Sequence, residues 1–306
     1  MTEPVERWLR RWKSPKDKKR NRKALLEEFP EIAGRDPTDL LRGAIDQQLH
    51  GQEPLELADA LDRWHTHKLG KGEATSAARW YWTIRGFFTA NGVRFFKIPR
   101  GVDTSKRGGW ERFTPTQEQV KMMVQTRTTP QDRAVVAFLA QTGQKIGVLT
   151  AMKWGMIKGI DSRGLVEVPR DLKTRRGESA NQSEVDYMFV VGRDSMRLLD
   201  ELSKDDEWLF DVSERQVSRI VDKAARDAGI QKKKATKVEG RYLRRVTPNT
   251  FRRYWKACMK RGGADPTLIE YMMGYKNERI TFDLGSLRES DLLDAYKKAE
   301  VELEVL

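Results

Sequence analysis

Apolar residues recur every three or four positions through most of this chain, which is the spacing of helices buried along one side. In the first hundred residues the clearest case is the stretch 75–91, which ends at Gly92. Its aromatic residues could stack on nucleic-acid bases, but a stripe at this spacing is more often part of a core, and we favour the core. Shorter helical patterns precede it, so residues 38–98 are predicted to form a helical domain.

The second half of the chain adds a different pattern. Residues 165–168 and 187–191 are short runs rich in β-branched residues, and they predict the two strands of a β-hairpin. Helical spacing resumes on both sides of them, including a stretch over 129–141 that ends at Thr142 and Gly143. The predicted fold class is therefore mainly α with a small antiparallel β-hairpin sheet.

The domain boundary is predicted where periodicity stops. Residues 99–112 are rich in Pro, Gly and cations and carry no helical or strand pattern, so they are assigned as a linker. We expect a basic N-terminal segment over 1–37, the helical domain over 38–98, and a second domain over 113–306. An amphipathic helix over 291–306 ends this second domain, and we expect it to pack on a neighbouring subunit or back on its own domain.

The charge balance indicates the kind of partner. Lys and Arg outnumber Asp and Glu by 58 to 45, for a net charge of +13. A salt-laced surface is the alternative to a polyanionic partner, but the cations gather in clusters within 13–23, 99–112, 173–176 and 231–245, which favours nucleic acid. We expect these clusters in turns or between periodic segments, from which they can reach phosphates. The DNA-binding candidates are Lys18, Lys19, Arg20, Arg79, Lys106, Arg107, Arg175, Arg176, Lys232, Lys233, Lys234, Arg244 and Arg245.

Composition also predicts what the protein lacks. No run approaches the roughly 20 apolar residues of a membrane span, and residues 1–23 have no apolar centre typical of a secretory signal. The single cysteine, Cys258, permits no intrachain disulfide, so a reducing, cytoplasmic location is expected. With only three histidines, a metal site is not expected.

The most informative stretch is 244–275, RRVTPNTFRRYWKACMKRGGADPTLIEYMMGY. Its Thr-Pro pair predicts a helix start, and Asn249 and Arg252, three residues apart, share one face of that helix. A second short helix is predicted to close at Gly274 and Tyr275. Taken alone, this pattern suits an ordinary helix pair with solvated arginines equally well.

A second stretch favours a functional interpretation. The run 137–157, AFLAQTGQKIGVLTAMKWGMI, resembles the segment of tyrosine recombinases, the phage-integrase type, in which a helix ends at Thr-Gly and an active-site arginine opens the next helix. The hairpin, the stretch 244–275 and the C-terminal helix follow in the family's order, so the resemblance covers about residues 111–306, with an archaeal-type integrase as the nearest form. It implies a helical core-binding domain and a catalytic-type domain that close around duplex DNA.

The resemblance also implies a chemistry and a set of site residues. Members of this family cut DNA by attack of a tyrosine on a phosphodiester, without metal, ATP or other cofactor. Cations stabilise the charge that builds on the phosphate oxygens, and a lysine can protonate the leaving 5′-oxygen. The corresponding catalytic positions in this chain are Lys145 for the first arginine, Lys173 for the hairpin lysine, Asn249 for the histidine, Arg252 for the second arginine and Tyr275 for the histidine or tryptophan.

Several of these positions depart from the family's pattern. Lys145 lacks the planar fork of arginine, and Val148 holds the place of an acidic residue. The position expected for the nucleophile is held by Phe282, which has no oxygen, and Tyr296 is the alternative nucleophile further along the chain. Only Lys173 and Arg252 match the family's residue types outright.

Three hypotheses therefore remain open at this stage. The chain is a site-specific recombinase or integrase that is inactive in this form or uses an altered pocket; or it is a naturally inactive relative that binds and organises DNA; or it is a basic nucleic-acid-binding protein of another kind. The first two predict double-stranded DNA as the partner and a homo-oligomer assembled on it. The family's DNA breaking and rejoining would be expected only under the first.

Overall fold

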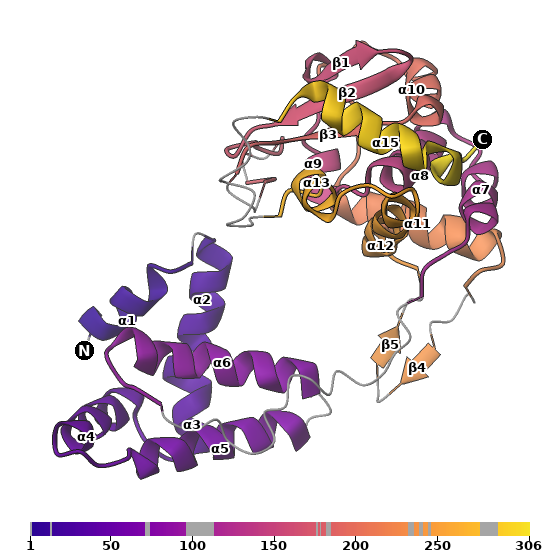
Figure 1. The fold of residues 1–306 in the computed structure, drawn as a ribbon. Coiled ribbons are helices and arrows are strands. Elements are labelled where there is room, and N and C mark those ends of the chain that lie inside the picture. The colour runs from indigo at the N-terminus through magenta and orange to yellow at the C-terminus, as the bar shows by residue number, and fades with distance from the viewer. Residues whose placement is uncertain are drawn as a thin grey trace. The chain divides into compact units, whose positions relative to one another are not determined.

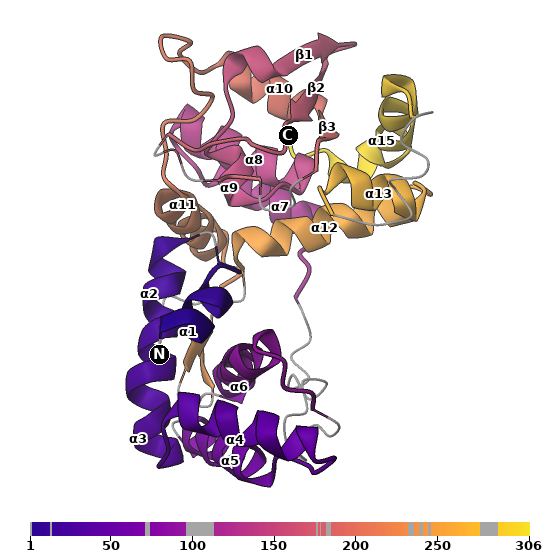
Figure 2. The same cartoon turned by 90° about the vertical axis from the view of Figure 1, so that its left-hand side faces the viewer.

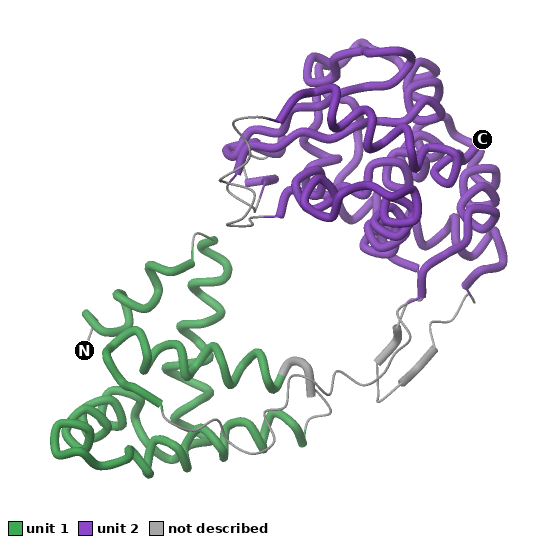
Figure 3. The backbone as a smooth tube through the Cα atoms, viewed as in Figure 1, with its two compact units in different colours: residues 1–111 green, residues 112–306 purple. Residues whose placement is uncertain are grey.

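The computed structural model divides the chain into two compact units, residues 1–111 and 112–306 (Figure 3). The predicted linker over 99–112 lies outside the described residues. The residues that the structure describes are 2–12, 14–70, 74–95, 113–175, 177, 179–181, 185–231, 236–238, 241–243, 246–275 and 287–306.

The regular secondary structure in the described part of the first unit is all helical, as predicted for residues 38–98. Short helices dominate its first 36 residues because Pro15, Pro30 and Pro37 each lie in the first turn of a new helix. Its elements are α1 (Thr2–Leu9), α2 (Pro15–Lys23), the π-helical turn η1 (Ala24–Glu28), α3 (Phe29–Ala33), α4 (Pro37–Leu49), α5 (Leu55–Gly70) and α6 (Ala74–Ala90) (Figure 1).

One core holds this unit together, and it includes the N-terminal segment. The Phe29 ring lies 5.7 Å from that of Trp64 and 6.2 Å from that of Phe88, and Trp8 lies 5.8 Å from Phe87. Trp8 and Phe29 are as fully buried as their partners. Residues 1–37 are therefore not a separate basic segment, because their aromatic residues fill the same core as residues 38–98.

The preference for a core role of the aromatic stripe in α6 is confirmed. Tyr81, Phe87 and Phe88 are at most 1% exposed, whereas Trp82 on the same helix is 38% exposed. The first cationic cluster was expected in a turn or between periodic segments, and this was wrong, because it is largely helical. Most of it forms α2, because Ser14 caps the helix, Pro15 opens it, and Lys and Arg are good helix formers.

The second unit surrounds a small sheet with helices. Its elements are α7 (Gln117–Gln125), α8 (Pro130–Thr142), α9 (Ile146–Leu149), the 3-10 turn η2 (Trp154–Met156), β1 (Ile157–Ile160), β2 (Arg163–Val168), β3 (Tyr187–Val191), α10 (Arg193–Asp200), α11 (Glu214–Asp227), β4 (Thr236–Val238), β5 (Arg241–Leu243), α12 (Pro248–Arg261), α13 (Pro266–Met272) and α15 (Glu289–Leu303) (Figure 1).

The sheet confirms the two predicted strands and adds a third. Its order is β1-β2-β3, antiparallel throughout, and Val166 in its middle strand lies opposite Ile157 and Phe189. The sequence of β1, IKGI, contains Gly and Lys, which are depleted in strands, so its pattern did not predict a strand. A further two-stranded pairing, β4 with β5, was also not predicted.

Helix α8 lies at the centre of the second unit. All residues from 134 to 142 are buried, since the sequence AVVAFLA is apolar around the whole helix. Helices α7, α10, α11 and α12 and strand β3 pack around it (Figures 1 and 2). Because α8 is enclosed, the loop that follows it is held in a fixed place, and this loop carries the first predicted site residue.

The C-terminal helix α15 packs back on its own unit, which is one of the two arrangements expected for it. It packs against α12, and the Tyr296 hydroxyl donates a hydrogen bond of 3.0 Å to the Gln141 carbonyl. Arg163 in β2 donates through Nε to Glu300 Oε1 at 2.8 Å, and both side chains are largely buried. Among the described helices, none is long and apolar enough to cross a membrane.

Candidate functional site

Arg252 is the centre of the candidate site. It lies in the second turn of α12, and its side chain is buried, with 6% of the residue exposed. Its Nη1 donates to the Gly143 carbonyl at 2.7 Å, and its Nη2 donates to the Met273 carbonyl at 3.2 Å. A guanidinium has five N–H donors, so these two bonds fix the group while leaving other donors for an anion. Arg252 therefore joins the loop after α8 to the turn after α13.

Two glycines allow this close approach. Gly143 has a φ of +60°, and a Cβ added there would lie 2.9 Å from the Trp255 Cβ. Gly274 has a φ of +64°, and an added Cβ would lie 2.6 Å from a ring carbon of Tyr187. Any larger residue would be strained at both positions and would also collide with a buried ring. The two backbone segments can thus present their carbonyls to Arg252.

Gln144 makes a second connection between the same two segments. Its Nε2 donates to the Met272 carbonyl at 2.7 Å, and its Oε1 accepts a hydrogen bond of 2.9 Å from the Tyr187 hydroxyl. Both side chains are buried. Sequence reasoning missed both residues. The one available signal was the position of Gln144 between Gly143 and Lys145, since the pairing with Tyr187 is a long-range contact.

Lys145 lies beside Arg252, at the residue that precedes α9. The residue is half-buried, and the pKa of its amine is lowered by desolvation first and by the charge of Arg252 second. Two cations that disfavour each other are brought together here, which is the arrangement expected of a site that binds an anion. The residues at 145 and 252, assigned to the two arginine positions of the family's pattern, therefore lie near each other in the structure.

Tyr275 completes this group. Its ring centroid lies 5.4 Å from the Arg252 guanidinium carbon and 5.7 Å from the Lys256 Nζ. The residue is 42% exposed, unlike the two residues before it, which are buried. Lys145, Arg252 and Tyr275, predicted from two separate stretches of the sequence, thus form one cluster.

Comparison with known proteins agrees with this geometry. The sequence model of the phage integrase family matches residues 114–283, more than half of the chain, and this range includes all three residues of the cluster. The chain belongs to the phage integrase family. Its members are tyrosine recombinases, as the resemblance of the sequence indicated.

Individual relatives of the family are similar over much of the chain. A stretch of 249 residues is 24% identical to tyrosine recombinase XerC of Thermodesulfovibrio yellowstonii, and it covers 75% of this chain and 77% of that protein. The post-cleavage structure of the XerH site-specific recombinase bound to palindromic difH substrate has a TM-score of 0.51 at 11% identity, and it covers 77% of this chain and 70% of that one. The pre-cleavage complex with difH has a TM-score of 0.50 at 10% identity, with coverages of 79% and 69%. The predicted fold is confirmed.

Of the remaining catalytic positions of the phage-integrase pattern, two are exposed and one lies outside the described residues. Asn249 is exposed in the first turn of α12, one turn before Arg252. Lys173 is exposed, and its backbone forms an isolated bridge with Ser179. Phe282 lies outside the described residues.

Tyr296, the alternative nucleophile, lies in the core of the second unit. It is 0% exposed, its hydroxyl is bonded to the Gln141 carbonyl, and burial raises its pKa well above the ordinary value. A phosphodiester cannot reach this oxygen without displacement of α15. The structure therefore favours a structural role for Tyr296.

The candidate DNA-binding cations differ in how far they are already neutralised. Arg79 is exposed on α6, and Lys19 is exposed on α2 beside Lys18, whereas Arg20 on the same helix pairs with Asp17 at 2.7 Å. Arg175 pairs with both Asp206 at 2.7 Å and Asp211 at 2.6 Å, so its charge is already compensated. The candidates that lie outside the described residues are Lys106, Arg107, Arg176, Lys232, Lys233, Lys234, Arg244 and Arg245.

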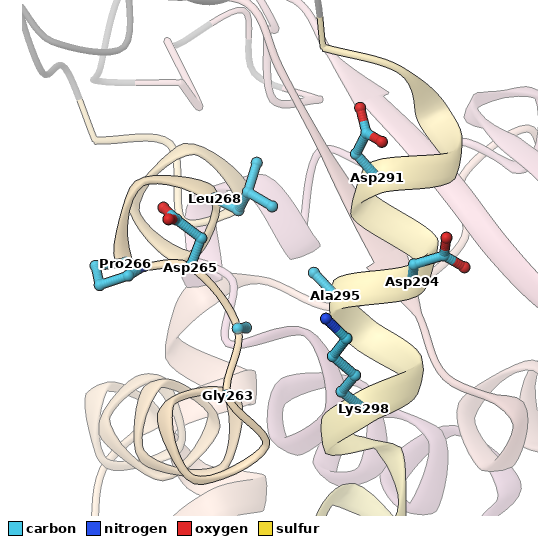
Figure 4. Close-up of a pocket in the computed structure, with 9 residues that line it drawn as sticks. Gly263, Asp265, Pro266, Leu268, Asp291, Asp294, Ala295 and Lys298 are labelled. Atoms are coloured by element: carbon cyan, nitrogen blue, oxygen red, sulfur yellow. The ribbon is translucent and has the colours of Figure 1, made fainter.

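A separate cavity of about 520 Å³ lies between the start of α13 and the helix α15 (Figure 4). Asp265 projects from one side, and Asp291, Asp294 and Lys298 project from α15 on the other. None of the residues that line it belongs to the cluster around Arg252. With three carboxylates against one amine, this cavity is unsuited to a phosphate, so it is not part of the candidate site. Among the described residues, no group of three or more His, Cys, Asp or Glu is placed to hold a metal ion.

Proposed function

We propose that this chain is a site-specific DNA recombinase of the integrase type, which breaks and rejoins DNA through a phosphotyrosine intermediate. The observation that carries the proposal is the cluster of Arg252, Lys145 and Tyr275, held by the bonds of Arg252 to the Gly143 and Met273 carbonyls. Cations fixed in advance stabilise a charge that develops on a phosphate without having to reorganise during the reaction. The family of the chain supports the same reaction.

The reaction is an exchange of phosphate esters. A tyrosine oxygen attacks the phosphorus, the bond from phosphorus to the 5′-oxygen breaks, and the proton lost by the phenol is balanced by one gained at the 5′-oxygen. Arg252 and Lys145 would bind the non-bridging oxygens, and Lys173 would protonate the 5′-oxygen. Asn249 and Tyr275 can donate hydrogen bonds to the same phosphate. One ester replaces another, so no energy source or cofactor is required.

The finer proposal is that cleavage is impaired in this form. Phe282 cannot attack a phosphate, so the chain cuts DNA only if another tyrosine takes that role. Lys145 also lacks the fork of arginine, and loss of one preorganised donor costs about 2.7–4 kcal/mol of barrier. The test is incubation of the unmodified chain and of the Phe282→Tyr variant with nicked duplexes, followed by a denaturing gel. A covalent protein–DNA adduct from either chain supports the recombinase function, and more adduct from the Phe282→Tyr variant supports impaired cleavage. No adduct from either chain, despite tight binding, contradicts the recombinase function.

A naturally inactive relative that binds and organises DNA is the second candidate. Phe282 favours it, because phenylalanine removes the reacting oxygen yet leaves the phosphate-binding cluster intact. Such a protein would bind duplex DNA, and its Phe282→Tyr variant would form no covalent adduct. The same gel therefore separates the two functions.

We further propose that the partner is double-stranded DNA, bound by a homo-oligomer in the cytoplasm. XerH was captured on a palindromic substrate, and a palindrome offers two equivalent half-sites to two copies of one chain. The exposed cations of α2 and α6 would contact phosphates. The assignment to an archaeal type stays a prediction.

A further inference from the structure

We propose that Tyr275 is the nucleophile of this chain, in place of the tyrosine that is missing at position 282. This inference rests on the recombinase function proposed above and names the residue that would carry the covalent intermediate. The juxtaposition behind it is an exposed phenol fixed beside the buried guanidinium of Arg252.

Exposure separates Tyr275 from the other tyrosines whose side chains the structure describes. A nucleophile must meet a phosphodiester of duplex DNA, so its hydroxyl must be open to solvent before DNA binds. Tyr275 is 42% exposed. The others are at most 8% exposed, namely Tyr81, Tyr187, Tyr254, Tyr271 and Tyr296. The seventh tyrosine, Tyr242, has only its backbone described.

The buried tyrosines are also chemically engaged. Burial raises the pKa of each of the five, which disfavours the phenolate that attacks phosphorus. Three of their hydroxyls donate hydrogen bonds within the protein, from Tyr187 to the Gln144 Oε1 at 2.9 Å, from Tyr254 to the Glu302 carbonyl at 2.6 Å, and from Tyr296 to the Gln141 carbonyl at 3.0 Å. These residues serve the fold and are not free to react.

The surroundings of Tyr275 suit the attacking oxygen. The Arg252 guanidinium carbon and the Lys256 Nζ lie 5.4 and 5.7 Å from its ring centroid, so a phosphate bound by these cations would lie close to Tyr275. Its backbone N–H donates to the Glu270 carbonyl at 3.1 Å, and Arg252 holds the Met273 carbonyl two residues earlier. The backbone of Tyr275 is therefore fixed relative to the guanidinium that binds the phosphate.

The step that follows keeps atoms and charges balanced. The phenolic oxygen of Tyr275 forms a bond to the phosphorus of the phosphodiester at Arg252, and its proton passes to solvent. The bond between phosphorus and the 5′-oxygen breaks, and the 5′-oxygen takes a proton from the ammonium of Lys173, which then regains one from solvent. Lys145 and Arg252 hold the non-bridging oxygens of the same phosphate during this step.

The test uses the full chain and a pool of nicked duplexes with a randomised centre, because loss of the short 5′-hydroxyl fragment traps the covalent product. We expect a protein–DNA adduct from the unmodified chain, with the nucleotide on the peptide that contains Tyr275 when digests are analysed by mass spectrometry. Tyr275→Phe should reduce adduct formation at least a hundredfold while the affinity for the same DNA stays within twofold. Tyr271→Phe, one turn earlier in α13, is the matched control and should keep the adduct.

Each other outcome overturns the assignment in an identifiable way. An adduct that survives Tyr275→Phe, or that maps to Tyr242 or another residue, leaves the recombinase function standing and removes Tyr275 as nucleophile. The same holds if only the Phe282→Tyr variant forms an adduct. No adduct from any of these chains, despite tight DNA binding, removes both the nucleophile and the recombinase function in favour of the DNA-organising one.

Discussion

The Tyr187 hydroxyl donates a hydrogen bond of 2.9 Å to the side-chain oxygen of Gln144, in a place where both residues are at most 2% exposed. This bond joins strand β3 to the loop that carries Lys145, and the other end of the same amide holds the Met272 carbonyl. A buried neutral side chain thus connects the loop that carries Lys145 to the turn that carries Tyr275.

Tyr187→Phe tests this connection. The substitution keeps the ring that packs against Gly274 but leaves the Gln144 oxygen buried without its donor, which should lower the free energy of unfolding by about 1–3 kcal/mol. Urea denaturation measures the change. Tyr275→Phe, at an exposed position, is the control and should stay within about 0.5 kcal/mol of the unmodified chain. Equal stabilities for both variants would mean that the Tyr187 bond is not a significant constraint.

Lys145 should make stability depend on alkaline pH. Its pKa is lower in the folded chain than in the unfolded chain, so between the two pKa values the unfolded state binds more protons and stability rises with pH. Below the folded pKa the amine is charged in both states, and the cost of placing it near Arg252 is fully present. The free energy of unfolding of the unmodified chain should therefore rise, relative to Lys145→Met, as pH increases toward 10.5. Urea titrations of both chains at several pH values check this, and a flat difference would contradict it.

The substitutions Phe282→Tyr and Lys145→Arg should act together on cleavage. Phe282→Tyr supplies an oxygen at the family's position, so adduct formation should increase. Addition of Lys145→Arg restores a bidentate phosphate contact and should raise the rate by roughly two to three orders of magnitude. Single-turnover kinetics on nicked duplexes measure both effects. If the double variant reacts no faster than Phe282→Tyr alone, Lys145 already supplies what the arginine would.

Binding of duplex DNA should depend steeply on salt, with unequal contributions from the candidate cations. Each phosphate contact adds about 0.9 to the slope of log affinity against log salt. Replacement of Lys18 and Lys19 by Gln should reduce the magnitude of that slope by the contribution of one to two phosphate contacts. Arg175→Gln should reduce it less, because Arg175 is already paired with Asp206 and Asp211. Fluorescence anisotropy at several salt concentrations gives the slopes, and a slope near zero for the unmodified chain would remove the DNA-binding function.

The sequence predicts features that depend on residues close together along the chain. The central helix α8 and the strands β2 and β3 were found because their apolar patterns are local properties of the chain. Lys145, Arg252 and Tyr275 were found because the family's pattern places them, and the structure brought them together.

The unpredicted features depend on distant partners or on context. The bond between Gln144 and Tyr187 spans 43 residues, and no local pattern records it. Strand β1 contains Lys158 and Gly159, and it is a strand because β2 pairs with it. The cationic cluster within 13–23 was not predicted as a helix, because it has no apolar periodicity. The helix start at Ser14 and Pro15 was the available signal.

The enclosure of α8 has a consequence for how the site moves. An element packed on all sides exchanges its amide hydrogens with solvent only when the surrounding structure opens, whereas helix ends and loops open alone at low energy. The Gly143 carbonyl that holds Arg252 follows directly on α8, so this anchor does not fray independently of the core. Hydrogen exchange should therefore show the amides of α8 and the Arg252 region of α12 opening together in one cooperative event. In that case, a substitution that speeds the opening of the core would shorten the lifetime of the anion-binding geometry by the same factor by which it speeds that opening.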